Sequence, residues 1–234
     1  YRRMDQLLGQ TLDRIGPQTL LMVLSDHGFT AFRRGVNLNA WLREQGWLTL
    51  KAGAESADFL GAIDWSQTRA YSFGLSGIYL NLQGREAQGI VTPAELPDLR
   101  RAIAARLAEL VDPADGCRPV LRVYENPDIY RGPYAERGPD LVVGFADGYR
   151  ASWENAVGSA AEPVFTANTR EWCGDHCVDR SLVPAFLGCN RPFTTADDRP
   201  ASILDVAPTL LKLFNLQPPD YLDGKAWSGF DAPP

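Results

Sequence analysis

Histidine and cysteine are scarce in this sequence, and long apolar runs are missing. Four cysteines in 234 residues are too few for a disulfide scaffold, so we expect reduced thiols and a cytoplasmic protein. No apolar run approaches the roughly 20 residues that a membrane-spanning helix needs, so we expect no membrane partner. The first residues carry Asp5 and Asp13 without an apolar core, a pattern that is not typical of a signal peptide.

Positive charge is also sparse. Lysine occurs at Lys51, Lys212 and Lys225, and the arginines are scattered, so the formal net charge is −6. A nucleic-acid-binding surface usually appears as a basic stripe, and none is visible. An acidic chain can still bind a phosphorylated small molecule where metal ions supply positive charge. Hydrophobic residues make up 45% of the chain, which is enough for a globular domain with a sizeable core.

The order of the apolar patterns indicates an α/β protein. Residues 4–15 carry the stripe of an amphipathic helix, and the continuous apolar run over 19–24 predicts a buried strand of a parallel sheet. Further helices are expected over 37–44, 97–111 and from Ser202 onward, and further strands within 70–82 and over 120–124, 141–145 and 183–187. Because helices and strands alternate, we predict a mostly parallel sheet sandwiched by helices. Residues 50–150 depart from the alternation and predict an inserted subdomain.

The first histidine follows the predicted strand at 19–24, in the order Ser25, Asp26, His27, Gly28. At a strand end, where the backbone turns, a neighbouring carboxylate and imidazole can converge on one ion, although within a strand they would point to opposite faces. Such oxygen and nitrogen ligands suit Zn²⁺ at about 2.0–2.2 Å, and the same set accepts Mn²⁺ or Fe²⁺. Taken alone, these residues favour a simpler interpretation, a turn-capping aspartate beside a solvent-facing histidine.

The second histidine, His176, follows Asp175 in a glycine-containing loop. Its neighbours Cys173 and Cys177 raise an alternative, a structural zinc site with two sulfur ligands and one nitrogen ligand. Such sites usually have four ligands with paired cysteines, so Cys189 or a distant group would have to complete it. Taken alone, His176 is more typical of a loop residue than of a metal ligand.

Several ordered segments together carry a resemblance to a known family. They are residues 21–29 (LMVLSDHGF), 174–176 (GDH), 202–211 (SILDVAPTLL) and 222–225 (LDGK). In this order they resemble the C-terminal half of the alkaline phosphatase superfamily, near its type I phosphodiesterase/nucleotide pyrophosphatase branch. The intervening segments 81–85, 130–134 and 138–141 resemble a microbial subgroup of predicted phosphohydrolases or phosphomutases. The resemblance spans nearly the whole chain and implies an alkaline phosphatase-like fold.

The resemblance implies a centre of two divalent metal ions, Zn²⁺ or alternatively Mn²⁺, bound by aspartate and histidine. It places Asp26 and His27 on the ion beside the nucleophile and His176 on the other ion, and it gives Asp205 a structural role. The nucleophile and the remaining ligands would lie before Tyr1. We therefore assign no catalytic nucleophile within the chain and expect this chain alone to be weakly active or inactive.

The function implied is that of a phosphoric ester hydrolase acting on a phosphate ester small molecule, with the 50–150 block selecting the substrate. Two alternatives stay open. One is phosphomutase or sulfatase-type transfer on the same fold, although a sulfatase would need a modified cysteine or serine before Tyr1. The other is an inactive or truncated binding domain. Asp26, His27 and His176 argue mildly against this second alternative.

Overall fold

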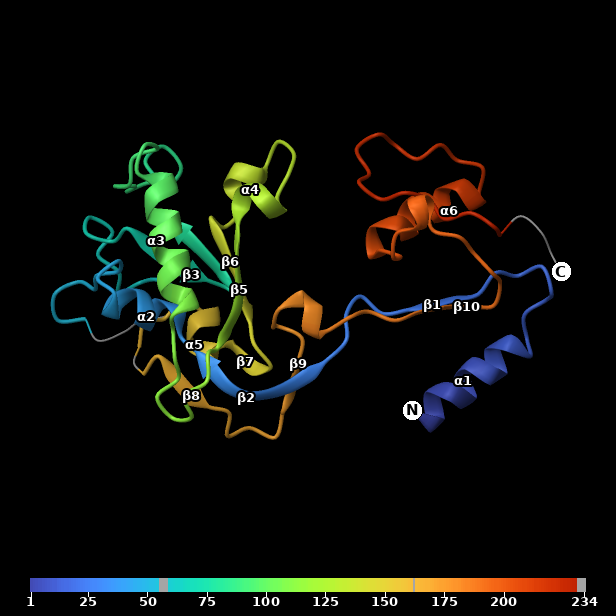
Figure 1. Cartoon of the computed structure of the whole chain (residues 1–234), viewed down its shortest axis with the longest axis horizontal. Coiled ribbons are helices and arrows are strands. Elements are labelled where there is room, and N and C mark those ends of the chain that lie inside the picture. Colours follow the sequence, from blue (N-terminus) through green and yellow to red (C-terminus); the bar gives the residue numbers. More distant parts are fainter. Residues whose placement is uncertain (55–58, 162, 231–234) are drawn as a thin grey trace. The chain divides into compact units, whose positions relative to one another are not determined.

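A computed structural model of the chain describes residues 1–54, 59–161 and 163–230 (Figure 1). Residues 55–58, which fall within the predicted inserted subdomain, lie outside the described residues. Across the described part of the chain, no helix combines the length and the apolar character that crossing a bilayer requires.

Two compact units make up the chain. A continuous unit comprises His27–Pro184, and a discontinuous unit comprises Tyr1–Asp26 and Ala185–Pro234. The predicted inserted subdomain at about 50–150 falls within the continuous unit, and its separate standing stays a prediction. Both helices and strands occur in the two units, so the prediction of a mixed α/β protein is confirmed.

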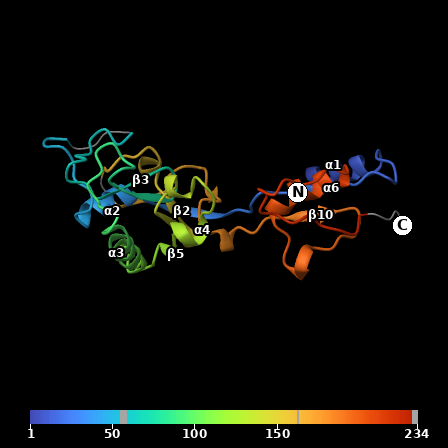
Figure 2. The same cartoon turned by 90° about the horizontal axis from the view of Figure 1, so that it is seen from above.

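The core of the continuous unit is an antiparallel sheet covered by a helix. Its strands follow the order β3 (Ala70–Phe73), β4 (Gly77–Leu80), β6 (Leu141–Phe145) and β5 (Val120–Glu125), and every neighbouring pair is antiparallel. Helix α3 (Leu96–Ala108) packs against β5 (Figures 1 and 2). Its buried residues are Leu99, Ile103 and Leu107, which lie four residues apart and therefore on one face.

A second sheet in the same unit is centred on β2 (Thr30–Val36). This strand pairs in parallel with β7 (Gly148–Ala151), and antiparallel with β8 (Phe165–Ala167) and β9 (Gly174–Asp175). Helix α2 (Leu38–Glu44) follows β2 directly and is capped by Asn37, whose side chain accepts hydrogen bonds from two amides of the first turn. The shorter elements of the unit are α4 (Asn126–Ile129), η1 (Ala135–Arg137), α5 (Trp153–Ala156) and η2 (Arg180–Leu182).

The discontinuous unit pairs β1 (Met22–Leu24) antiparallel with β10 (Leu187–Cys189). Its helical elements are α1 (Arg2–Leu12), η3 (Ala196–Asp198), η4 (Ile203–Asp205) and α6 (Val206–Leu213). Asp205 is fully buried and accepts hydrogen bonds from the backbone amides of Ser202 and Lys225 and from the indole of Trp227. Burial would raise the pKa of Asp205, but the hydrogen bonds from Arg199 and from these amides hold it below its ordinary value.

The prediction of a mostly parallel sheet is wrong for the described residues. Among the named strands that they form, β2 and β7 make the single parallel pair. The connection from β3 to β4 spans three residues, which suits a hairpin and is too short for a parallel crossover. The predicted mostly parallel architecture therefore does not describe either unit.

The predicted buried strand over 19–24 is also wrong in extent and in burial. Residues 22–24 alone form strand β1, and Val23 and Leu24 are 38% and 40% exposed. A continuous apolar run does not by itself distinguish a strand buried on both faces from other apolar segments. The strand expected over 183–187 is displaced to β10, at residues 187–189.

Two matched leucine substitutions test the core of the continuous unit. We expect Leu107→Ala to lower the free energy of unfolding by about 2–5 kcal/mol, because a buried leucine leaves a cavity when truncated. Leu121→Ala makes the same change on β5 at a side chain that is 52% exposed, so its effect should be well under 2 kcal/mol. Urea denaturation of both variants measures the difference. Equal losses would contradict the packing of α3 on β5.

Candidate metal centre

The two histidines lie at the ends of paired strands. His27 precedes β2 by a short segment, and His176 follows β9 directly. The antiparallel register pairs Thr30 with Asp175. Because the two chain segments run in opposite directions, the residues before Thr30 lie beside the residues after Asp175. Beyond this ladder, the Gly28 amide donates a hydrogen bond of 3.0 Å to the Val183 carbonyl, so the segment after His176 returns to the residues before β2.

The two imidazole rings stack on each other. Their centroids are 3.7 Å apart and their planes differ by 9°. The ring of Phe29 meets both imidazoles edge-on, with centroids 5.3 Å from His27 and 5.9 Å from His176. Phe29 is itself 64% exposed, so one aromatic ring borders the histidine pair and remains accessible to solvent. The structure therefore brings together two of the three predicted ligands.

The tautomer of His27 follows from its contact with the backbone. Its Nδ1 lies 2.9 Å from the Gly28 carbonyl oxygen. A carbonyl only accepts hydrogen bonds, so Nδ1 carries the proton and donates it. In the neutral ring, the lone pair then lies on Nε2. This is the usual arrangement of a metal-binding histidine, in which one nitrogen is held by a backbone or carboxylate acceptor and the other binds the ion.

Asp175 organises the loop that carries His176. One carboxylate oxygen, Oδ1, accepts the backbone amides of His176 at 2.7 Å and Cys177 at 2.9 Å. The other oxygen, Oδ2, accepts a hydrogen bond from the guanidinium of Arg150. Burial pushes the pKa of Asp175 upward, but the hydrogen bonds from Cys177 and Arg150 outweigh it and hold the pKa below its ordinary value.

Asp175, His176 and Cys177 also form a group that could bind a metal ion. Each residue has one potential ligand atom, and these three atoms lie within 4.8 Å of one another. This group contains one sulfur atom, whereas the structural zinc alternative needs both Cys173 and Cys177. Burial, followed by the hydrogen bond to Asp175 and its charge, raises the pKa of the Cys177 thiol to about 12. When no metal ion is bound, Cys177 is therefore a protonated thiol at neutral pH.

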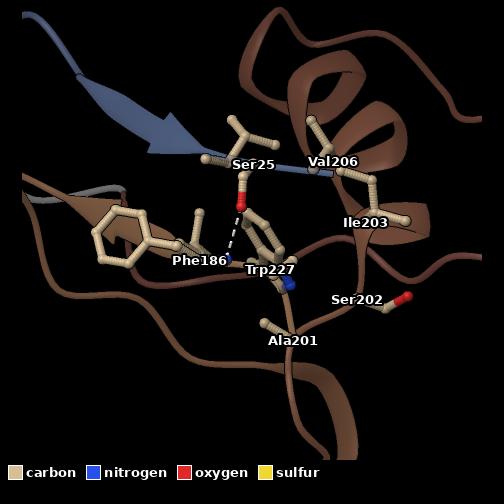
Figure 3. Close-up of a pocket in the computed structure, with 10 residues that line it drawn as sticks. Ser25, Phe186, Ala201, Ser202, Ile203, Val206 and Trp227 are labelled. Carbon is tan, nitrogen blue, oxygen red and sulfur yellow. Dashed lines mark hydrogen bonds between the residues drawn. The ribbon is translucent and has the colours of Figure 1, made fainter. Parts of the chain in front are cut away.

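Asp26 is the last residue of the discontinuous unit and is exposed. Its role as a ligand stays a prediction. Within the same unit, Ser25 lines an apolar cavity of about 140 Å³ and its Oγ accepts the Phe186 amide at 2.9 Å (Figure 3). The described residues that line this cavity include neither a histidine nor a carboxylate, so the cavity offers no base that would activate Ser25 or Ser202.

Sequence reasoning missed the parts played by Asp175, Arg150 and Phe29. An aspartate followed by a turn was the available signal for Asp175, because aspartate side chains commonly accept backbone amides one or two residues further along. Nothing in the local sequence indicated that Arg150 would reach Asp175. Phe29 was visible within the segment 21–29, but its position against both imidazoles depends on the strand register.

Alkylation of Cys177 tests the environment of the loop. The thiolate is the reactive form, and a pKa of about 12 leaves about one thiolate in ten thousand at pH 8. We expect iodoacetamide to label Cys177 in the native, metal-free chain much more slowly than in the unfolded chain. The rate should rise about tenfold per pH unit well beyond pH 9, where an ordinary thiol levels off. Mass spectrometry of the Cys177 peptide follows the reaction, and a native rate that levels off near pH 9 would contradict the assignment.

The family model described as type I phosphodiesterase / nucleotide pyrophosphatase matches residues 1–172. His27 lies inside this span and His176 lies just beyond it. No curated protein matches the chain. The family match covers most of the chain and confirms the resemblance: the chain belongs to the type I phosphodiesterase/nucleotide pyrophosphatase family, whose members are hydrolases that generally depend on metal ions.

Proposed function

We propose that the chain supplies part of the two-ion centre of a phosphoric ester hydrolase, with Asp26 and His27 on one ion and His176 on the other. The ions are Zn²⁺ or alternatively Mn²⁺. The observation that supports this proposal most directly is the stacking of the His27 and His176 rings at 3.7 Å. These are the sole histidines of the sequence, and they come from opposite ends of the continuous unit to meet at one strand ladder.

The geometry of the stack favours two ions over one. The lone pair of an imidazole nitrogen lies in the plane of its ring, and these two planes are nearly parallel. A single ion at the usual zinc–nitrogen distance of about 2.0–2.1 Å could not lie in both planes. The ring separation of 3.7 Å is similar to the separation of about 3.5–4 Å between ions in two-metal sites. One ion for each ring therefore fits the donors better.

Divalent ions held here would supply Lewis-acid stabilisation to the oxygens of a phosphoryl group. The residues of this chain have their own tasks. His27 keeps Nδ1 occupied by the Gly28 carbonyl and would offer Nε2 to its ion. Phe29 borders the site with its ring edge-on to both imidazoles. The proposed substrate is a phosphate ester small molecule, selected by the 50–150 block, and the attacking group is proposed to come from residues before Tyr1.

Metal binding by single variants tests the ligand assignment. We expect the chain to bind about two Zn²⁺ ions, and His27→Ala and His176→Ala each to weaken binding at one of them. Asp26→Asn should behave as His27→Ala does. Asp13→Asn is a matched control, since it makes the same change at an exposed aspartate of the same unit. Equilibrium dialysis with elemental analysis measures the stoichiometry. Full occupancy in both histidine variants would overturn the proposed centre.

The reaction is tested with para-nitrophenyl phosphate and bis(para-nitrophenyl) phosphate. The chain itself and a form extended before Tyr1 are assayed with Zn²⁺ and with Mn²⁺. We expect turnover in the extended form and its loss in His27→Ala or His176→Ala of that form. Phosphoryl transfer to an added alcohol in preference to water would instead indicate the phosphomutase alternative. Metal binding without turnover of either ester in either form would indicate a binding domain.

A further inference from the structure

A buried ion pair joins Arg150 to Asp175, the residue before His176. The side chains of Arg150 and Asp175 are 4% and 6% exposed. The guanidinium of Arg150 lies between two aromatic rings, 4.6 Å from the centroid of Phe32 and 3.9 Å from that of Trp153. These contacts are cation–π interactions, and they fix the plane from which Arg150 reaches Asp175.

A contribution to the stability of the fold does not by itself explain why this buried ion pair is present. Removing two charges from water is costly, and replacing a buried pair by apolar side chains of similar volume is often neutral or stabilising. The cost is increased here because Nη2 of Arg150 is buried and, within the described residues, lacks a hydrogen-bond partner. The pair therefore calls for another explanation, and the hydrogen bonds of Asp175 supply one.

Asp175 connects the pair to the loop that follows β9. Its Oδ1 accepts the amides of His176 and Cys177, so the backbone of the two residues turns around the carboxylate. Nδ1 of His176 lies 3.8 Å from the same Oδ1, which places the ring next to the carboxylate without a direct hydrogen bond. The backbone that carries the His176 side chain is thus held by one oxygen of Asp175, and the other oxygen of the same carboxylate accepts a hydrogen bond from Arg150.

We infer that Asp175 is a positioning residue for His176, and that Arg150 holds Asp175 in place for this purpose. The inference rests on the proposed function, because it assigns the pair a role in presenting His176 to its ion. It also assigns Asp175 a role different from that of a ligand. Both carboxylate oxygens of Asp175 already accept hydrogen bonds, Oδ1 from backbone amides and Oδ2 from the guanidinium of Arg150.

The test separates positioning from stability. The double substitution Arg150→Met with Asp175→Ala removes both buried charges together, so that neither is left unpaired, and methionine retains apolar bulk between Phe32 and Trp153. Asp175→Asn is the conservative variant, because an amide oxygen can still accept the two backbone amides. Asp98→Ala is the matched control, since Asp98 pairs with Arg101 at the surface.

Two measurements are made on each folded variant. The first is the ¹H–¹⁵N spectrum of the imidazole side chains in the metal-free chain, which contains two ring systems because the sequence contains two histidines. The second is the Zn²⁺ affinity, by competition with a chelator. We expect the double variant to lose the ring-current shifts of the stack and to bind Zn²⁺ about 10–100-fold more weakly. Asp175→Asn should retain most of the ring-current shifts and most of the Zn²⁺ affinity. Asp98→Ala should match the wild type in both measurements.

A folded double variant with wild-type imidazole signals and wild-type Zn²⁺ affinity would overturn the inference. If the double variant does not fold, amide hydrogen exchange of the wild-type chain decides. Slow exchange at His176 and Cys177 supports the inference, and rapid exchange at both overturns it. If the wild type binds no Zn²⁺, the proposed function fails. The imidazole spectra still report whether Asp175 orients His176, so the two failures are distinguishable.

Discussion

The antiparallel pairing of β2 with β9 is the constraint on which the candidate centre depends. This ladder is short, with Thr30 opposite Asp175 and Ala31 opposite Gly174. It joins the start of the continuous unit to a loop near its end. A shift of the register by one residue would turn each side chain to the other face and would separate His27 from His176. The stacked rings and the edge-on Phe29 both follow from this one alignment.

Buried carboxylates serve as internal anchors in both units. Asp140 accepts the Leu80 amide and pairs with Arg85 in the antiparallel sheet, and Asp205 joins the start of η4 to the segment that contains Lys225. Asp175 follows the same pattern beside the histidines. In each case an arginine neutralises the charge while backbone amides determine the orientation. An aspartate adjacent to a histidine in this chain is therefore not automatically a metal ligand, and its hydrogen bonds decide which role it has.

Local signals predicted the elements that are fixed locally. Asn37 before an apolar helix and the spacing of Leu99, Ile103 and Leu107 gave α2 and α3 near their observed bounds, because capping and helical periodicity depend on neighbouring residues. Strand direction was predicted wrongly, since apolar runs do not record which strand will pair with which. The scarcity of histidine and the family resemblance pointed to His27 and His176. The link from Arg150 to Asp175 could not be predicted, because it exists only after three strands have assembled.

The pairing of β2 with β9 also has a consequence for the order of folding. Its two strands are separated by most of the continuous unit, and contacts between residues distant in sequence carry the entropy cost of closing a long loop. Local helices and hairpins form faster than such contacts. We therefore expect His27 and His176 to become neighbours late, after the intervening sheet and its helix have formed. A divalent ion would be captured by a chain that is already folded and would have little part in guiding the polypeptide to its native topology.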